Sequence, residues 1–252
     1  MTLISLLLLV VLLPYPGHSA SVRDGIVNGT EAKPHSRPYM VSVQIDEKHQ
    51  CGGFLVSESF VMTAAHCWKN RKVTFTAVVG AHDISNKNEG SIRFPVEKYA
   101  VHPQYQDDET YDYDILLLKL KGTVIKSERV KWISIPAQKE DIPANSVCSV
   151  AGWGRTGTKK SGSHCLLETN TKIMDKARCT SLWDTPITPR MVCAQHPGGP
   201  CWGDSGGPLV CDSVAVGIVS FGDANTCDKP IQPEVYTKIS EILPWIKSII
   251  NS

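Results

Sequence analysis

The sequence predicts an all-β fold, a barrel or a sandwich, that closes with one helix. Three observations support this: many short apolar runs of similar length, frequent turn-forming residues between them, and one segment of helical period near the C-terminus. The chain has 252 residues and a formal net charge of +1, and it contains no long run of Lys or Arg. This composition is that of a globular protein of one or two domains and gives no indication of a nucleic-acid partner.

Eight runs have the length and apolar character of strands: 39–45, 51–56, 60–64, 73–79, 115–120, 146–153, 166–173 and 214–221. Turn-forming residues separate many of them, as in Gly198-Gly199-Pro200. The stretch 121–145 is poorer in pattern, so we expect it to connect two halves of the fold.

The C-terminal segment predicts an amphipathic helix. Apolar residues recur there at helical spacing: Ile242, Leu243, Ile246, Ile249 and Ile250. Ser240 is the expected N-cap, and Pro244 is tolerated in a first turn.

The N-terminus predicts secretion. Residues 3–13 are almost wholly apolar, which is too short for a stable transmembrane anchor but typical of a signal peptide. Small residues Ser19 and Ala20 offer a cleavage site, so we assign 1–20 to the signal peptide. The alternative is a membrane anchor, and no other stretch is apolar enough to span a bilayer.

Nine cysteines in a secreted chain imply disulfides, and the odd number leaves at least one outside intramolecular pairs. No Cys-x-x-Cys pair occurs, so we expect neither a structural zinc site nor any other metal or cofactor.

The most informative segment is Gly203-Asp204-Ser205-Gly206-Gly207-Pro208. Glycines let the backbone turn sharply and approach a substrate closely, and the amides of Gly203 and Ser205 can point into one small volume. The alternative is a glycine-rich turn with an incidental serine. The full hexapeptide between Cys201 and Cys211 favours a nucleophile instead.

A serine nucleophile needs a base, and the base needs an acid to orient it. His66 ends an apolar strand after small residues that leave room for another chain. A lone buried histidine is usually structural, but the serine motif downstream favours catalysis. Asp114 lies at the head of the apolar run 115–120, where a buried acid requires a partner. Asp112 is the competing acid, and the closer position of Asp114 favours it.

These three segments, in the order His, Asp, Ser, resemble the chymotrypsin/trypsin family of serine proteases, and the resemblance covers the chain from Ile26 onward. It implies an all-β fold of two six-stranded antiparallel β-barrels packed perpendicular to each other, with a C-terminal α-helix and the active site between the barrels. It also implies that His66 is the general base, that Asp114 orients it, that Ser205 attacks the carbonyl, and that the amides of Gly203 and Ser205 form the oxyanion hole.

Within that family, residues 34–40 and 80–84 resemble granule-associated proteases of the granzyme, mast-cell chymase and cathepsin G type. The resemblance implies a zymogen with a propeptide at 21–25 and a protease domain at 26–252. Cleavage after Gly25 would free the Ile26 ammonium to pair with Asp204. A prior tryptic cut at Arg23 followed by loss of the dipeptide Asp24-Gly25 is the expected route.

The resemblance also implies four disulfides and a specificity pocket. The disulfides are Cys51–Cys67, Cys148–Cys211, Cys179–Cys193 and Cys201–Cys227, which leaves Cys165 as a buried thiol or a link to a second chain. The pocket residues are Gly199, Ser220, Phe221, Gly222 and Glu234. Because Gly199 replaces the aspartate of trypsins, we expect cleavage after Lys or Arg through Glu234 and also after Phe, Tyr or Leu; alternatively, Glu234 only narrows the pocket.

The expected partners are protein or peptide substrates and a protein protease inhibitor. The expected form is a secreted monomer, with storage in secretory granules as one expected location. The sequon at Asn28 is expected to stay unmodified beside the inserted N-terminus. One rival interpretation is an inactive family member that serves as a binding or antimicrobial protein. Such members usually lack one of the three catalytic residues, whereas the His66, Asp114 and Ser205 motifs are all present here. The other is a serine esterase on an α/β scaffold, but its Gly-x-Ser-x-Gly motif and alternating helices are missing from the sequence.

Overall fold

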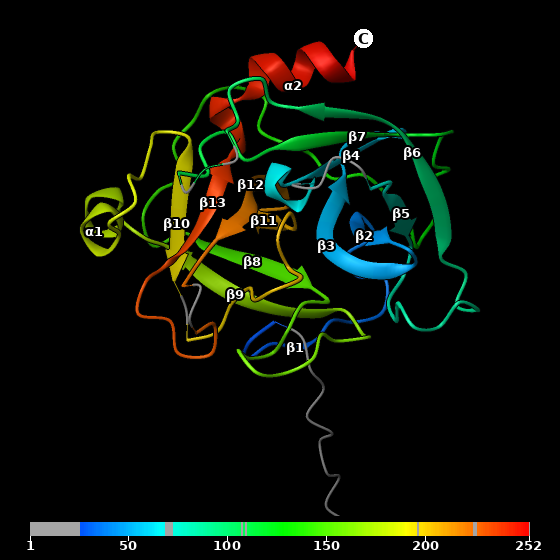
Figure 1. The fold of residues 1–252 in the computed structure, drawn as a ribbon, viewed down its shortest axis with the longest axis horizontal. Helices are drawn as coiled ribbons and strands as arrows, with labels where there is room; N and C mark the ends of the chain where they lie inside the picture. Colours follow the sequence, from blue (N-terminus) through cyan, green and yellow to red (C-terminus); the bar gives the residue numbers. More distant parts are fainter. Residues whose placement is uncertain are drawn as a thin grey trace, which may run out of the picture.

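A computed structural model describes residues 26–68, 73–106, 108, 110–195, 197–223 and 226–251. The expected signal peptide at 1–20 and propeptide at 21–25 lie outside the described residues. Figure 1 shows two rounded β-sheets side by side, with the C-terminal helix α2 running across one end of the molecule.

The first barrel closes in the strand order β2-β3-β4-β7-β6-β5, and all of its pairs are antiparallel. Its strands are β2 (Met40–Ile45), β3 (Lys48–Leu55), β4 (Phe60–Thr63), β5 (Thr76–Val79), β6 (Ile92–Val101) and β7 (Leu116–Leu120). Alternate residues such as Val41, Val43, Leu116 and Leu118 are fully buried in its interior. Full burial of each such side chain stabilises the fold by roughly 1.5–3 kcal/mol.

The second barrel closes through the pairing of β8 with β9, and β1 adds a short strand to β9. The strands are β1 (Thr30–Glu31), β8 (Val147–Gly152), β9 (Leu167–Ile173), β10 (Met191–Gln195), β11 (Pro208–Cys211), β12 (Val214–Phe221) and β13 (Glu234–Lys238). The predicted all-β fold with two six-stranded barrels is therefore confirmed.

Four short helices complete the described elements: the 3-10 helices η1 (Ala65–Trp68) and η2 (Ile239–Glu241), and the α-helices α1 (Lys176–Leu182) and α2 (Leu243–Ile250). None of the helices in the described part of the chain is long and apolar enough to cross a membrane.

Helix α2 connects the two barrels at their common end. Its buried Ile246 belongs to the same apolar cluster as Met62 of β4 and Ile218 of β12. The predicted helix and its first-turn Pro244 are confirmed, but the predicted cap is wrong. Ile242 is the N-cap, and Ser240 lies in η2, where its hydroxyl donates to the Glu140 carbonyl at 2.9 Å.

The chain passes between the barrels from the end of β7 at Leu120 to the start of β8 at Val147. The residues between these two strands are all described and contain no named helix or strand. The register of β4 with β7 matters most for function, because Thr63 lies opposite Leu116. Segments just beyond these two strand ends, which carry His66 and Asp114, are thereby brought together.

Candidate active site

His66 and Asp114 make two short contacts with each other. The His66 backbone amide donates to Asp114 Oδ1 at 2.8 Å, and the ring Nδ1 lies 2.7 Å from Oδ2. Because the Asp114 carboxylate accepts at both oxygens, the proton of a neutral His66 ring belongs on Nδ1. Nε2, the other ring nitrogen, then carries a lone pair that can accept a proton.

Asp114 is fully buried, and its surroundings keep it ionised. Burial opposes the charge, but His66 and the hydrogen bonds from His66 and Ser220 outweigh it and hold the pKa of Asp114 below its ordinary value. The Ser220 hydroxyl donates to Oδ2 at 2.6 Å. The carboxylate therefore has partners for its remaining acceptor sites.

The competing acid, Asp112, has a different partner. Its Oδ2 lies 2.6 Å from the Arg190 guanidinium, and its Oδ1 accepts from the Thr188 hydroxyl at 2.9 Å. Arg190 and Thr188 oppose the effect of partial burial and lower the pKa of Asp112. Asp114, and not Asp112, is the carboxylate that contacts His66.

Ser205 lies in a tight loop before β11, and three amides of this loop already have acceptors. The amides of Asp204, Gly206 and Gly207 donate to carbonyls at 2.8–3.0 Å. Gly203 has φ of 103°, a left-handed conformation that favours glycine. Within the described residues, the amides of Gly203 and Ser205 donate to no protein acceptor, which is the state that an oxyanion site requires.

His49 holds this loop from the first barrel. Its Nε2 lies 2.9 Å from the Gly203 carbonyl, and its Nδ1 lies 2.8 Å from the Ser42 hydroxyl. Burial lowers the pKa of His49 to about 4, so the ring is neutral at neutral pH. Because the Gly203 carbonyl can only accept, the ring proton lies on Nε2, and Ser42 donates to Nδ1.

Asp204 is a fully buried carboxylate next to Ser205. Its oxygens accept from the amides of Gly154 at 2.8 Å and Cys201 at 3.0 Å. Burial nevertheless raises its pKa to about 7. Ile26 is also fully buried, within the apolar cluster of the second barrel, and Val27 forms two backbone hydrogen bonds with Gly199. In the unprocessed chain the Ile26 nitrogen is an uncharged peptide amide.

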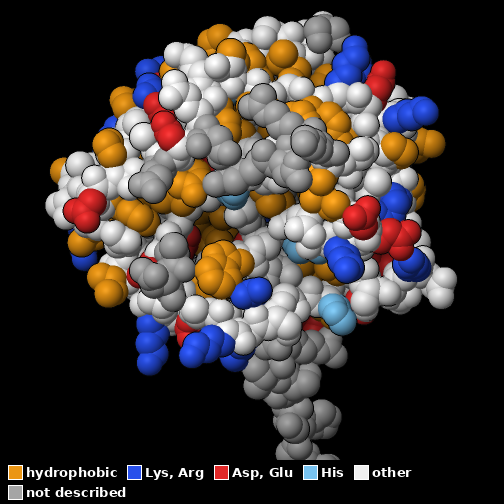
Figure 2. Space-filling view, viewed as in Figure 1, with side chains coloured by type: hydrophobic (Ala, Val, Ile, Leu, Met, Phe, Trp, Pro, Cys, Tyr) orange, Lys and Arg blue, Asp and Glu red, His pale blue; other side chains and the backbone are white. Residues whose placement is uncertain are grey.

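His66 and Ser205 line one cavity of about 440 Å³. The other lining residues are Tyr111, Trp183, Thr185, Pro200, Cys201, Trp202, Val219, Ser220, Phe221, Gly222, Asp223, Cys227 and Glu234. Figure 2 shows hydrophobic side chains around a hollow in this face of the molecule. The volume lies in the range of small-molecule binding pockets, and aromatic side chains form part of the lining.

Glu234 places a carboxyl group in the wall of this cavity. A Cβ at position 222 would lie 2.2 Å from Glu234 Oε2, so the carboxyl group packs where only glycine leaves room. Burial, followed by the negative charges of Asp204 and Asp223, raises the pKa of Glu234 to about 8. The group is therefore mostly protonated at neutral pH unless a cation enters the pocket.

The structure has four disulfides, and they are the four pairs that the resemblance implies. They join Cys51 to Cys67, Cys148 to Cys211, Cys179 to Cys193 and Cys201 to Cys227. Cys165 forms no disulfide. Disulfides of this number are typical of secreted proteins.

The structure does not bring all of the site residues identified from the sequence to the cavity wall: Asp114, Gly203, Asp204 and Ile26 are not among its lining residues. His66, Ser205, Ser220, Phe221, Gly222 and Glu234 line the cavity, whereas Gly199 lies behind Glu234, with its would-be Cβ 3.6 Å from that residue's Cγ. Sequence reasoning missed His49, Tyr111, Trp183 and Trp202. Single aromatic or histidine residues carry no motif, so only the fold reveals their place.

Comparison with known proteins shows the family of the chain. The Trypsin family model matches residues 26–246. The chain is 39% identical to Duodenase-1 of Bos taurus, with 99% of this chain and 97% of that protein covered. It is 37% identical to Cathepsin G of Homo sapiens, with coverage of 98% and 94%, and 41% identical to Chymase of Papio hamadryas, with coverage of 90% and 91%.

The fold has a solved counterpart in neuropsin, a serine protease expressed in the limbic system of mouse brain. The TM-score is 0.82 at 33% identity, and the match covers 89% of this chain and all of that one. Both the family model and the relatives span nearly the whole described chain. The protein therefore belongs to the trypsin family of serine proteases, and it is a hydrolase that acts on proteins.

Proposed function

We propose that the protein is a secreted endopeptidase, made as a zymogen, that cleaves peptide bonds through Ser205, His66 and Asp114. One observation carries the proposal: buried Asp114 holds both the backbone and the ring of His66 in the cavity that Ser205 also lines. This arrangement supplies a nucleophile, a base and an orienting acid at one place.

In the proposed reaction, His66 Nε2 takes the proton of the Ser205 hydroxyl as the serine oxygen attacks the substrate carbonyl. The resulting imidazolium is stabilised by ionised Asp114 and then gives the proton to the leaving amine. An acyl-enzyme forms at Ser205. Water, deprotonated by the same histidine, releases the acid product and restores the serine.

The negative charge on the attacked carbonyl oxygen is stabilised by the amides of Gly203 and Ser205. The hydrogen bond from His49 to the Gly203 carbonyl fixes the peptide that precedes the nucleophile loop. Preorganised donors of this kind contribute about 2.7–4 kcal/mol each to lowering the barrier.

Activation follows from the chemistry of Asp204. In the unprocessed chain this carboxyl group is buried with two amide donors, and its pKa of about 7 reflects an unfavourable ionised state. Cleavage before Ile26 creates an ammonium group on a residue whose side chain is already buried in the same barrel. Pairing of that cation with Asp204 stabilises the ionised carboxylate and, with it, the adjoining loop of Ser205.

Primary specificity is set by a pocket with both an acid and aromatic walls. Phe221 stacks on Tyr111 with ring centroids 5.1 Å apart and meets Trp183 edge-on at 5.0 Å. These rings favour Phe, Tyr or Leu, whereas Glu234 offers a charge partner to Lys or Arg. We therefore assign dual specificity to this enzyme.

The four disulfides support secretion. The proposal also includes granule storage, control by a protein protease inhibitor and a monomeric state. The alternative to the monomer is a dimer linked by a disulfide through Cys165. Storage in granules is suggested by the likeness to Cathepsin G and Granzyme F of Mus musculus, the latter 38% identical.

Peptide-library cleavage tests the proposal. Protein processed before Ile26 should cleave after Lys, Arg, Phe, Tyr and Leu, and Ser205→Ala in the same processed form should cleave nothing. Glu234→Gly should lose Lys and Arg sites selectively. Cleavage by Ser205→Ala would contradict the proposed role of Ser205 as the nucleophile. Full activity in the unprocessed chain would contradict the proposal that the protein is made as a zymogen.

A further inference from the structure

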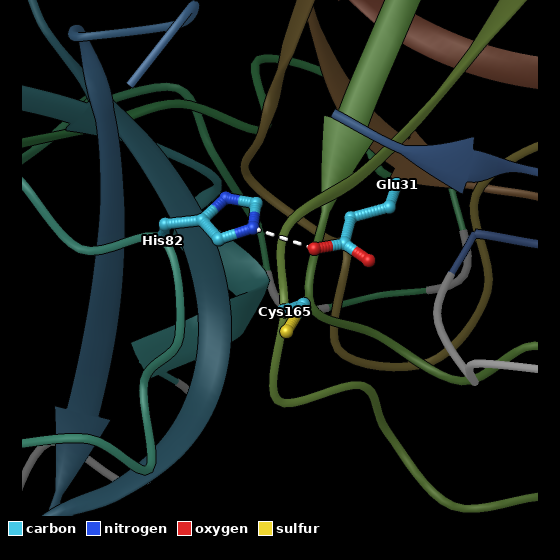
Figure 3. Close-up of side chains that lie close together, drawn as sticks. All are labelled: Glu31, His82 and Cys165. Carbon is cyan, nitrogen blue, oxygen red and sulfur yellow. Dashed lines mark hydrogen bonds and ion pairs between the residues drawn. The ribbon is translucent and has the colours of Figure 1, made fainter. Parts of the chain in front are cut away.

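Three potential metal ligands meet on the side of the second barrel where β1 joins it. Glu31 comes from β1, His82 from the loop after β5, and Cys165 from the segment between β8 and β9. One ligand atom from each lies within 4.8 Å of the other two. Figure 3 shows the His82 ring in contact with the Glu31 carboxylate, at an Nε2–Oε1 distance of 3.0 Å, with Cys165 beside them.

Hydrogen bonds and strand pairing fix the backbone of each of these residues. The His82 carbonyl accepts from the Leu166 amide at 2.9 Å and from the Trp153 indole at 3.0 Å. Asp83 and Cys165 form an antiparallel bridge, and Glu31 lies opposite Leu167 in the β1–β9 register. Such rigid support is what a metal site needs, because the ligands do not have to be ordered on binding.

Two buried histidine nitrogens next to the cluster lack hydrogen-bond partners in the described part of the chain. Nδ1 of His82 and Nδ1 of His35 are both buried and have no hydrogen-bond partner among the described residues. The two rings are neighbours, with centroids 6.5 Å apart. Buried polar atoms without partners are costly, so a water molecule between the two rings would stabilise this region beside the cluster.

We propose that Glu31, His82 and Cys165 bind a zinc ion, with water as the fourth ligand. Thiolate, imidazole and carboxylate are the three side-chain ligands that Zn²⁺ takes in proteins, whereas Ca²⁺ and Mg²⁺ require oxygen. Tetrahedral bonds to zinc place ligand atoms about 3.3–3.6 Å apart. The ligand atoms of the observed cluster lie within 4.8 Å of one another, so side-chain shifts would bring them to this spacing.

Binding converts the Cys165 thiol to a thiolate, and the released proton passes to solvent. The ion then connects three segments that are distant in sequence. His82 follows β5 of the first barrel, and Cys165 lies between β8 and β9 of the second. Glu31 lies five residues after Ile26, on the segment that docks on activation in the proposed function on which this step rests. Zinc at this position would stabilise the folded chain and the docked N-terminal segment.

Metal titration of the purified secreted protein tests the site. Competition with a chromophoric chelator should give one equivalent of bound Zn²⁺, and Co²⁺ should give a thiolate-to-metal charge-transfer band. Cys165→Ser should abolish that band and weaken zinc binding by more than about tenfold, and Glu31→Gln should also weaken it. Bound zinc should slow alkylation of the Cys165 thiol and raise Tm in the parent protein but not in Cys165→Ser.

His164→Asn is the matched control, because this exposed histidine adjoins Cys165 but lies outside the cluster. It should leave zinc affinity unchanged. Circular dichroism verifies that each variant is folded, and the mild Glu31→Gln change gives a second test if Cys165→Ser is unstable. Lack of stoichiometric binding, or equal affinity in the parent, Cys165→Ser and Glu31→Gln, would overturn the proposal, as would a loss of affinity in His164→Asn alone.

Discussion

Glu234 gives the proposed specificity pocket a pH-dependent charge, and the effect of this charge can be measured on substrates. With a pKa of about 8, the carboxyl group is ionised in about a tenth of molecules at pH 7 and in about nine-tenths at pH 9. Only the ionised form attracts a Lys side chain. The ratio of kcat/KM for a Lys substrate to that for the matched Phe substrate should therefore rise about tenfold between these pH values, which equals about 1.4 kcal/mol.

The assay uses two peptides that differ only in the residue before the cleaved bond. Their kcat/KM values report ionisations of the free enzyme, and taking the ratio removes the shared dependence on His66. Glu234→Gln keeps the shape of the side chain but cannot ionise, so its ratio should be flat across this range. A flat ratio in the parent enzyme, or the same rise in Glu234→Gln, would refute the assignment of Glu234 to recognition of Lys.

Three further predictions concern the buried groups of the site. Asp114→Asn should lower kcat by about ten-thousandfold, because His66 is left in the wrong tautomer, whereas Asp112→Asn should keep kcat within a few-fold; steady-state kinetics compares them. In the unprocessed chain, the free energy of unfolding should fall by on the order of 4 kcal/mol as the pH rises from about 4 to about 7. The raised pKa of Asp204 is the reason: below both pKa values its stabilising contribution is complete, and it is lost as the pH rises from the pKa of the unfolded chain to that of the folded chain. Urea unfolding of Asp204→Asn should show no such pH-dependent fall in the free energy of unfolding. The same pH dependence in Asp204→Asn as in the parent would contradict the assignment to Asp204. His49→Ala should lower the free energy of unfolding by about 1–3 kcal/mol, because the Gly203 carbonyl loses its donor. The same change should reduce kcat more than it raises KM. An unchanged kcat would contradict the proposal that His49 supports the oxyanion site.

Sequence patterns predicted the strands whose apolar residues form the barrel interiors. The eight predicted runs correspond to β2, β3, β4, β5, β7, β8, β9 and β12, with ends shifted by up to three residues. Strands β1, β6, β10, β11 and β13 were not predicted. Strand β6 carries charged residues and Pro95, and β11 has four residues beginning with Pro208, so neither shows a strand period. Tertiary pairing, not local propensity, makes them strands.

The residues with strong local motifs were identified, and those that depend on the fold were not. Ser205 and His66 lie in distinctive segments, and Asp114 adjoins a buried run, so sequence reasoning reached them. His49 supports the loop of Ser205 from another barrel, and its role depends on a contact across 154 sequence positions. The predicted Ser240 cap was wrong because η2 precedes α2 and turns that hydroxyl toward the Glu140 carbonyl.

Active-site labelling tests most directly whether Ser205 is a nucleophile activated by His66. A fluorophosphonate probe is added to protein processed before Ile26, and the modified residue is identified by mass spectrometry while the rate is followed. The account predicts one adduct, on Ser205, with none in Ser205→Ala and a rate lowered by several orders of magnitude in His66→Ala. An adduct on a different residue, or an equal rate in His66→Ala, would contradict it.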